Sequence, residues 1–357
     1  MQRKIIHADC DCFFAAVEMR DDPSLAAIPF AIGGDPSRRG VIATCNYPAR
    51  EFGVRSAMAS GLALKLCPQL RILPGNMEKY REASARIDQI FRQYTELVEP
   101  LSLDEAFLDV SQSEQCDGSA TLMAEQIRRQ VADEVGITIS AGVAPNKFLA
   151  KVASDWQKPD GLTVVRPDQV DDFVRQLPVK KIPGVGPVTA AKLAEKGVVL
   201  CEDLQRYSLL QLQQWMGSMG ERLYQRCRGI DPRDVQPTRE RKSLSVEHTF
   251  STDLPDIGTC QEPLAVLFEK LQRRLERKGP DKLIAGVLLK LKFSDFTSTT
   301  VETRIDSCGY DRINLALYRP LLVQGFERGK RPVRLLGVGV RFSDEPVMAD
   351  RQLALPF

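Results

Sequence analysis

Three carboxylates lie at the ends of segments whose other residues suit buried strands. Asp9 follows the segment 4–8, which is predicted to be a short buried strand, and Asp104 and Glu105 lie within the alternating run 101–110. Neighbouring side chains of a regular strand point to opposite faces, so Asp104 and Glu105 can serve one site only where the chain bends, as at a hairpin tip. If Asp9 lies on the adjacent strand, the three carboxylates converge.

Carboxylates that converge in this way need cations, because like charges at short distance repel. Oxygen ligands without His or Cys suit Mg²⁺ or Mn²⁺, and two such ions would support an in-line phosphoryl displacement. Solvated strand ends or salt-bridge partners are the alternative interpretation of these acids.

A second group of side chains could neutralise a polyphosphate. Tyr47, Arg50 and Arg55 lie in one short segment, and Lys158 lies in the turn sequence 158–161. Hydroxyl, guanidinium and ammonium groups are the usual partners of phosphate oxygens. Each of these residues taken alone is more often an ordinary surface residue.

Residues 181–197 contain a glycine hairpin followed by an amphipathic helix, with Gly184 and Gly186 in the hairpin and Lys192 on the helix. Glycines let a backbone approach a ligand closely, and free N–H groups at a helix start bind phosphate oxygens. The pattern predicts a helix-hairpin-helix that binds a DNA backbone without reading its sequence. Residues 215–230 are either a weaker second copy or simple helix packing.

The hydrophobic pattern predicts the elements that must position these residues. Strands are expected at 4–8, 41–45, 101–110, 137–143 and 162–165, and helices at 13–19, 60–67, 77–94 and 119–135, with a further helix opened by Pro145. This alternation predicts an α+β sheet with helices on one face. Residues 168–230 switch to nearly all helix, and the polar segment 231–242, with two prolines, predicts a linker.

A second α/β pattern follows the linker, with a helix at 262–278, a strand run at 283–293 and a final strand at 333–342. Residues 239–341 hold 19 Lys and Arg against 13 Asp and Glu, a net charge of +6 in a chain of net charge +2. Basic charge is therefore concentrated in one C-terminal domain.

The composition excludes several classes of protein. With 357 residues, 43% hydrophobic and 27% charged, the chain is neither disordered, collagen-like nor a coiled coil. No apolar stretch is long enough to span a bilayer, and acidic residues interrupt any N-terminal signal peptide. Nine cysteines without a C-x-x-C pair indicate reduced thiols in a cytosolic protein, not a zinc site.

Five motifs together resemble those of the Y-family DNA polymerases, and their order and spacing are most similar to the bacterial DinB branch. The motifs are Asp9-Cys10-Asp11-Cys12-Phe13-Phe14, Asn46-Tyr47-Pro48-Ala49-Arg50, Ser102-Leu103-Asp104-Glu105-Ala106, Ser140-Ala141-Gly142-Val143-Ala144 and Lys158-Pro159-Asp160-Gly161.

The resemblance implies an α+β right-hand polymerase with a ferredoxin-like palm. Its domains would be a palm at 1–10 and 75–165, small fingers at 11–74, a helical thumb at 166–230 with the helix-hairpin-helix, the linker at 231–242, an α/β little finger at 243–341 and a tail at 342–357. The implied activity is template-directed, low-fidelity translesion synthesis from dNTPs. Because every segment is already assigned to a domain, we expect no proofreading.

The resemblance also implies roles for single residues. Asp9 and Asp104 would hold two Mg²⁺ ions, for which Mn²⁺ can substitute, Glu105 would hold the catalytic one, and the backbone carbonyl of Cys10 would complete the other. Phe13, Phe14, Thr44, Tyr47, Arg50 and Lys158 would bind the nucleotide, with Phe14 as the steric gate against ribonucleotides. Ala43 stands where relatives often have a hydroxyl residue, and Asp11 is not a usual ligand.

The implied partners are primer-template DNA, dNTPs and the sliding clamp, with no membrane. Gly184, Gly186, Lys192, Lys290 and Lys292 would contact the DNA backbone, and Gln352, Leu353, Leu355 and Phe357 would bind the clamp's beta subunit. We expect a monomer in the cytoplasm, associated with the nucleoid. A helix-hairpin-helix nuclease and a non-catalytic DNA-binding protein are the rival interpretations.

Overall fold

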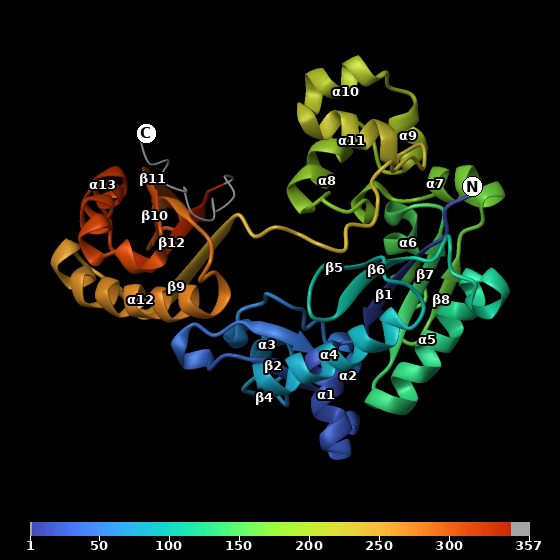
Figure 1. Cartoon of the computed structure of the whole chain (residues 1–357), viewed down its shortest axis with the longest axis horizontal. Coiled ribbons are helices and arrows are strands. Elements are labelled where there is room, and N and C mark those ends of the chain that lie inside the picture. The colour runs from blue at the N-terminus through green and yellow to red at the C-terminus, as the bar shows by residue number, and fades with distance from the viewer. Residues whose placement is uncertain (1, 344–357) are drawn as a thin grey trace, which may run out of the picture. The chain divides into compact units, whose positions relative to one another are not determined.

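A computed structural model of the chain describes residues 2–343 (Figure 1). Contacts divide the chain into two compact units, residues 1–34 with 41–238 and residues 35–40 with 239–357. Each unit is described by itself below.

The first unit is built on a five-stranded sheet of order β5-β6-β1-β7-β8. The strands are β1 (Ile5–Cys10), β5 (Val98–Pro100), β6 (Glu105–Asp109), β7 (Ile139–Ala144) and β8 (Leu162–Val164). β1 lies at the centre and pairs antiparallel with β6 and β7, while β8 runs parallel to β7. The expected strand at 101–110 is shorter than predicted, because residues 101–104 form a bend between β5 and β6.

Helices cover both faces of this sheet, so the expectation of helices on one face is wrong. α4 (Met77–Arg92) and α5 (Ala120–Val135) share a core with Ile6 of β1, together with α1 (Phe13–Asp21). α6 (Lys147–Ser154) packs with Ile5 in a different core on the opposite face (Figure 1). The reason is visible in β1, whose consecutive residues are buried on both sides.

The start of α6 also differs from the prediction. Pro145 lies before the helix, and Asn146 is its N-cap, with the side-chain oxygen accepting from the N–H of Leu149 at 3.1 Å. An asparagine N-cap satisfies one of the free N–H groups of the first turn, so the helix begins two residues later than proline alone indicated.

A small three-stranded sheet holds the segment that carries Tyr47. Its order is β3-β2-β4, with β2 (Phe30–Gly33), β3 (Ile42–Cys45) and β4 (Arg71–Leu73), beside the short helices α2 (Tyr47–Glu51) and α3 (Ser60–Leu66). The buried side chain of Asn46 accepts from the N–H groups of Phe30 and Ala49, both at 3.1 Å. It therefore ties the start of α2 to β2.

Residues 168–230 are largely helical, as predicted. They form α7 (Val170–Arg175), α8 (Pro187–Ala194), α9 (Cys201–Gln205), α10 (Leu209–Met216) and α11 (Ser218–Arg226). A Cβ on Gly220 would lie 2.0 Å from the carbonyl oxygen of Leu212, so this glycine allows α10 and α11 to pack closely. Helix packing thus accounts for Gly220, and a second DNA-binding hairpin at 215–230 stays a prediction.

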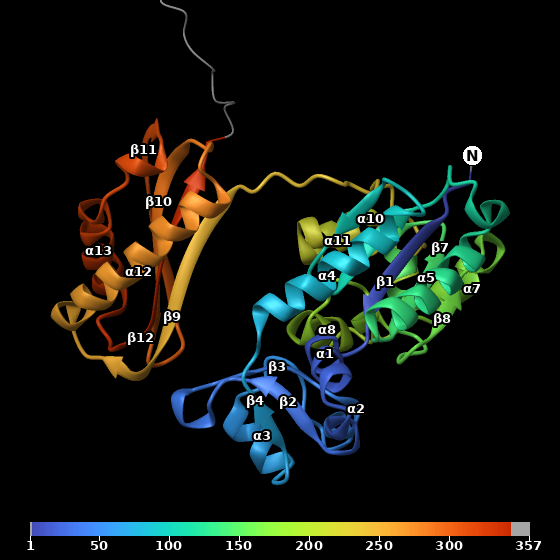
Figure 2. The ribbon, with the colours of Figure 1, turned by 60° about the horizontal axis from the view of Figure 1, so that its bottom comes forward.

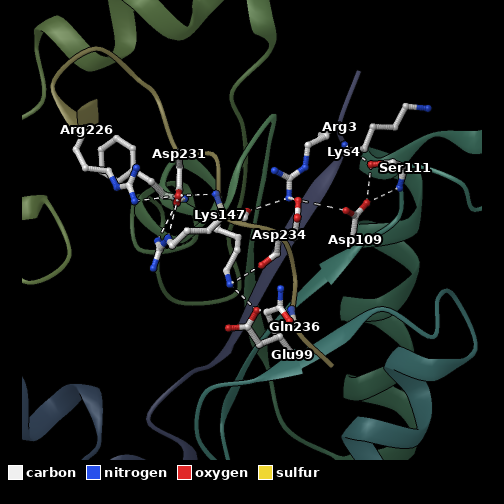
Figure 3. A network of polar contacts seen from close by, with 12 residues as sticks. Arg3, Lys4, Glu99, Asp109, Ser111, Lys147, Arg226, Asp231, Asp234 and Gln236 are labelled. Atoms are coloured by element: carbon white, nitrogen blue, oxygen red, sulfur yellow. Dashed lines mark hydrogen bonds and ion pairs between the residues drawn. The ribbon is translucent and has the colours of Figure 1, made fainter. Parts of the chain in front are cut away.

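Polar contacts hold the segment 231–236 against the sheet of the first unit (Figure 3). The fully buried carboxylate of Asp231 pairs with Arg226 at 2.9 Å and Arg233 at 2.8 Å, and accepts from the N–H of Phe148 at 3.0 Å. Beyond it, the N–H of Gln236 donates to the carboxylate of Glu99 at 2.7 Å.

The same carboxylate of Glu99 forms a close ion pair with the buried Lys147, whose ammonium also donates to the carbonyl of Asp234 at 3.1 Å. Arg3 lies 3.6 Å from the carboxylate of Asp234 and donates to the carbonyl of Arg233 at 3.0 Å. These contacts stop at Gln236, and residues 237–242 are exposed and without regular structure.

The second unit has a four-stranded antiparallel sheet of order β11-β10-β12-β9. The strands are β9 (Ser243–Leu254), β10 (Ile284–Phe293), β11 (Ser298–Cys308) and β12 (Val333–Phe342). One face is covered by α12 (Ile257–Lys278) and α13 (Arg319–Gly329) (Figure 2). α12 begins before the predicted 262, because Asp256 caps it by accepting from the N–H of Thr259 at 2.9 Å.

Two further observations concern the described residues as a whole. None of their helices has the length and apolar composition needed to cross a membrane. All nine cysteines have free thiols, of which seven are buried, while Cys116 and Cys308 are partly exposed.

Candidate active site

The three predicted carboxylates lie at one end of the central sheet. Asp9 near the end of β1 pairs in register with Glu105, the first residue of β6. Asp104 lies in the bend before β6, where the N–H of Leu101 donates to the carbonyl of Glu105 at 3.0 Å and closes the turn. The bend that these neighbouring acids require is therefore present.

The structure groups these acids in two sets. Asp9 and Asp104 line one cavity together with Cys10. Asp9, Glu105 and His7 each offer a ligand atom within 4.8 Å of the others. Asp9 is common to both sets, so the two groups meet at its carboxylate.

Each set has a lysine close to one of its carboxylates. Lys158 forms a close ion pair with Asp9, and Lys151 of α6 forms one with Glu105. Burial raises the pKa of Asp9, and the ammonium of Lys158 opposes that rise. A divalent cation would favour the ionised form of a buried carboxylate in the same way, so the oxygen-rich donor set fits a hard cation.

His7 is a site residue that sequence reasoning missed. It is fully buried, its Nε2 lies 3.3 Å from Glu105 Oε2, and its Nδ1 lies 2.7 Å from Ser154 Oγ. Burial lowers the pKa of His7 to about 4, so the ring is neutral at pH 7. Because Nε2 faces a carboxylate, we assign the ring proton to that nitrogen.

The carboxylate of Glu105 is correspondingly stabilised as an anion. The hydrogen bond from His7 and the ion pair with Lys151 lower its pKa to about 2. A signal in the sequence could have revealed His7: it lies two residues before Asp9 on a strand, so the two side chains share one face of the sheet.

The cavity beside Asp9 brings together most of the predicted nucleotide-binding residues. Its lining comprises Asp9, Cys10, Cys12, Phe13, Phe14, Ala43, Thr44, Arg50, Ser56, Asp104 and Lys158. Tyr47 lies next to this set, with the guanidinium of Arg50 4.7 Å from its ring centre. The structure thus places carboxylates, basic groups and two phenylalanine rings around one space.

Phe14 forms a fixed part of this wall. Its ring stacks on that of Tyr80 with centres 4.3 Å apart and an angle of 14° between the planes. Tyr80 is itself fully buried, and its hydroxyl donates to Glu18 at 2.8 Å. Phe13, in contrast, is almost completely buried and packs in the core as well as touching the cavity.

The glycine hairpin before α8 is open to solvent. A Cβ built on Gly184 or Gly186 would meet nothing within 4 Å, and Gly184 has a φ of +94°. A second cavity extends from this hairpin to Asp9, since it is lined by Asp9, Lys151, Val152, Asp155, Lys180, Lys181, Ile182, Pro183, Gly184 and Val185. Lys192 lies exposed on α8.

The two lysines predicted on the second unit share one face of β10, two residues apart. Lys290 pairs with Glu247 of β9 at 2.9 Å, and Lys292 lies with its ammonium 5.0 Å from the ring centre of Phe296. The predicted clamp-binding residues, Gln352, Leu353, Leu355 and Phe357, lie outside the described residues.

Three segments of the chain match known families. Residues 8–155 match the impB/mucB/samB family, residues 180–231 match the thumb domain of DNA polymerase-iota, and residues 241–355 match the C-terminal domain of the impB/mucB/samB family.

Curated relatives match over nearly the full length. The chain is 55% identical over 350 residues to the DNA polymerase IV of Ralstonia nicotianae, covering 98% of this chain and 97% of that protein. It is 57% identical over 343 residues to the DNA polymerase IV of Pseudomonas syringae pv. tomato, covering 96% of each.

Solved structures are similar as well. A Y-family DNA polymerase chimera superposes with a TM-score of 0.86 at 27% identity, over 95% of this chain and 98% of that one. The insertion ternary complex of Dbh DNA polymerase gives a TM-score of 0.67 at 26% identity over the same shares. The chain therefore belongs to the impB/mucB/samB family and has the fold of a Y-family DNA polymerase.

Proposed function

We propose that this DNA-directed DNA polymerase extends a primer on a template by two-metal nucleotidyl transfer, with Asp9, Asp104 and Glu105 as the metal-binding carboxylates. The enzyme acts in translesion synthesis, at low fidelity and without proofreading. One observation carries the residue assignment: Asp9 and Asp104 line the same cavity as Phe14, Thr44, Arg50 and Lys158.

Divalent ions, of which Mg²⁺ is the proposed species, would supply charge neutralisation and a more acidic primer 3′-hydroxyl at the carboxylates. The 3′ oxygen forms a bond to the α-phosphorus of a dNTP, and the bond from that phosphorus to the bridging oxygen breaks to release pyrophosphate. The hydroxyl proton passes to solvent. The carbonyl of Cys10 would be a further oxygen ligand.

Protein side chains have separate tasks in this reaction. Lys158, Arg50 and Tyr47 bind the triphosphate, because cations and a hydroxyl suit its oxygens. Thr44 and Phe13 line the nucleotide site. Phe14 lies under the sugar, where a stacked ring leaves no room for a 2′-hydroxyl and excludes ribonucleotides by steric clash.

DNA binding is proposed for the open hairpin of Gly184 and Gly186 with Lys192, and for Lys290 and Lys292 on the second unit. Free backbone N–H groups and lysines bind phosphates without reading bases. The division into palm, fingers, thumb and little finger, the clamp-binding tail, the monomeric state and a cytoplasmic, nucleoid-associated location are proposed with it.

The test is primer extension with Mg²⁺ on wild type and Asp104→Asn. We expect the variant to lose extension by at least about a thousandfold, because a ligand oxygen is replaced by an amide that binds hard cations poorly. Binding of labelled primer-template should stay within about threefold of wild type.

Two outcomes would contradict the proposal. A nuclease would shorten the labelled primer in wild type and need no dNTP. A non-catalytic DNA-binding protein would leave the primer unchanged, and Asp104→Asn would have no effect on any activity.

A further inference from the structure

Asp11 is a buried carboxylate directly after β1, and it is only 2% exposed. Four donors surround its two oxygens. Oδ1 accepts from Ser140 Oγ at 2.8 Å and faces the hydroxyl of Tyr47 at 3.4 Å. Oδ2 accepts from Thr138 Oγ1 at 2.9 Å and from the backbone N–H of Asp160 at 2.8 Å.

We propose that Asp11 is a positioning residue for the triphosphate of the incoming dNTP, acting through the loop that carries Lys158 and through Tyr47. This inference rests on the proposed function, and it assigns a role to a residue whose motif leaves that role open. Asp11 is not among the residues that line the cavity beside Asp9, so it acts through its neighbours.

The donors of Asp11 argue against a role as a metal ligand. Both oxygens already accept hydrogen bonds from within the protein, as a buried carboxylate requires. Removing the carboxylate would leave the N–H of Asp160, the buried hydroxyl of Ser140 and the half-buried hydroxyl of Thr138 without this acceptor, which is costly where water cannot replace it.

The loop 158–161 depends on Asp11 and on the strand beside it. The N–H of Asp160 is held by Asp11, and the N–H of Gly161 donates to Ser140 Oγ at 3.2 Å. Arg128 of α5 pairs with the carboxylate of Asp160 at 2.7 Å.

The loop is also tightly packed against itself. A Cβ on Gly161 would lie 2.1 Å from the carbonyl oxygen of Gln157, and Asp160 has a φ of +50°. A loop with so little freedom presents the ammonium of Lys158 at one place, beside Asp9. Asp11 therefore sets where this cation meets a ligand.

Tyr47 connects Asp11 to the small sheet. Its hydroxyl has one proton and lies 3.4 Å from Asp11 Oδ1, where it can donate a long hydrogen bond. Burial and the charge of Asp11 raise the pKa of Tyr47, so the phenol stays protonated and remains a donor. On dNTP binding the proton can turn to a phosphate oxygen, and Asp11 keeps its three other donors.

The experiment measures steady-state incorporation of one dNTP by wild type, Asp11→Asn and Asp11→Ala. We expect KM for dNTP to rise at least about tenfold in Asp11→Ala, with a smaller rise in Asp11→Asn, which keeps one acceptor oxygen. Affinity for dNTP, measured by fluorescence on a dideoxy-terminated primer, should fall in parallel. Because that readout needs no turnover, it separates positioning of the nucleotide from chemistry.

Coupling to Lys158 distinguishes this role from a general loss of structure. Adding Asp11→Ala to Lys158→Ala should raise KM by a smaller factor than Asp11→Ala alone, about threefold or less, since one of the two groups that Asp11 positions is already absent and only Tyr47 remains. Asp231→Asn is the matched control: it also alters a buried, hydrogen-bonded acid, and KM for dNTP should remain at the wild-type value.

If Asp11→Ala does not fold, the double variant Thr138→Val with Ser140→Ala removes two donors and leaves the carboxylate, and we expect the same direction of change. The inference would be overturned if folded Asp11 variants, or this double variant, kept the wild-type KM for dNTP. It would also be overturned if the KM of Asp11→Ala combined with Lys158→Ala rose by the product of the two single effects. Failure of wild type to extend a primer at all would instead overturn the proposed function.

Discussion

At the scale of single residues, the site is built from side chains whose orientation other side chains determine. Tyr80 supports Phe14 from behind, and His7 with Lys151 orients Glu105. Packing and hydrogen bonds from neighbouring side chains keep a reactive group within a narrow range of positions. Stabilisation of a transition state requires such fixed positions.

The stacked pair of Phe14 and Tyr80 leads to a prediction about sugar selection. Phe14→Val removes the flat ring at the proposed position of the sugar but keeps an apolar wall, so ribonucleotides should be incorporated at least about a hundredfold more readily than by wild type. The measurement is the ratio of kcat/KM for a ribonucleotide to that for its deoxy form. Unchanged selectivity would show that another side chain excludes the 2′-hydroxyl.

His7 should make the protein less stable in acid. Its pKa is about 4 in the folded chain against 6.5 for an ordinary histidine, so the unfolded chain binds its proton first as the pH falls. The stability that neutral His7 contributes is complete above pH 6.5 and is lost on the way to pH 4. The loss should be on the order of 2 kcal/mol near pH 4.5.

Urea unfolding of wild type and His7→Gln between pH 7.5 and 4.5 checks this expectation. The variant should lose stability less steeply over that range. His248→Gln, which alters the exposed histidine on β9, is the matched control and should follow wild type. Parallel curves for wild type and His7→Gln would contradict the assignment.

At the scale of elements, the sequence predicted the helices and strands that have a strong hydrophobic pattern and a residue that clearly ends them. β1 and β7 are apolar runs, and α5 ends at Gly136, whose φ is +77°. The sequence did not predict β9 or β11, because both are edge strands with many exposed polar side chains and little apolar alternation. Their pairing with β12 and β10 forms them, and that pairing is not local.

The candidate site likewise has features that local sequence predicts and features that depend on contacts between distant segments. The convergence of Asp9, Asp104 and Glu105 could be inferred from acids placed in apolar strands. The contact of His7 and Lys151 with Glu105 could not, because it depends on the register of β1 with β6 and on α6 packing across β1. The role of each site residue stays a prediction until the variants are measured.

Close packing of α6 on β7 predicts a sharp difference between two glycines. A Cβ on Gly142 would lie 2.1 Å from the carbonyl oxygen of Ala150, whereas a Cβ on Gly61 in α3 would meet nothing within 4 Å. Gly142→Ala should destabilise the protein by more than about 2 kcal/mol, because backbone must move. Gly61→Ala should be neutral or stabilising by about 0.5–1 kcal/mol.

Chemical unfolding of both glycine variants gives the comparison directly. An unchanged stability of Gly142→Ala would mean that α6 can shift away from the sheet at little cost.

At the scale of the whole molecule, the linker has two parts with different properties. Residues 231–236 are held to the first unit through Asp231, Glu99 and Lys147, and residues 237–242 are exposed. The division between the two units falls between residues 238 and 239, two residues after the held segment.

Limited trypsin digestion should therefore cut first after Arg239 or Arg241, and not after Arg233. A protease needs several residues of accessible chain outside regular structure, and residues 237–241 are exposed and irregular. Asp231→Asn weakens the anchor and should make cleavage after Arg233 faster than in wild type. Mass spectrometry of the first fragments tests this, and an initial cut after Arg233 in the wild type would contradict it.

The distribution of thiols offers a practical route to follow the two units in solution. Cys116 and Cys308 are the partly exposed cysteines, one in each unit, while the other seven are buried. Mild maleimide labelling should attach donor and acceptor dyes at these two positions without any engineered cysteine. Energy transfer between them would then report how DNA and nucleotide change the separation of the units.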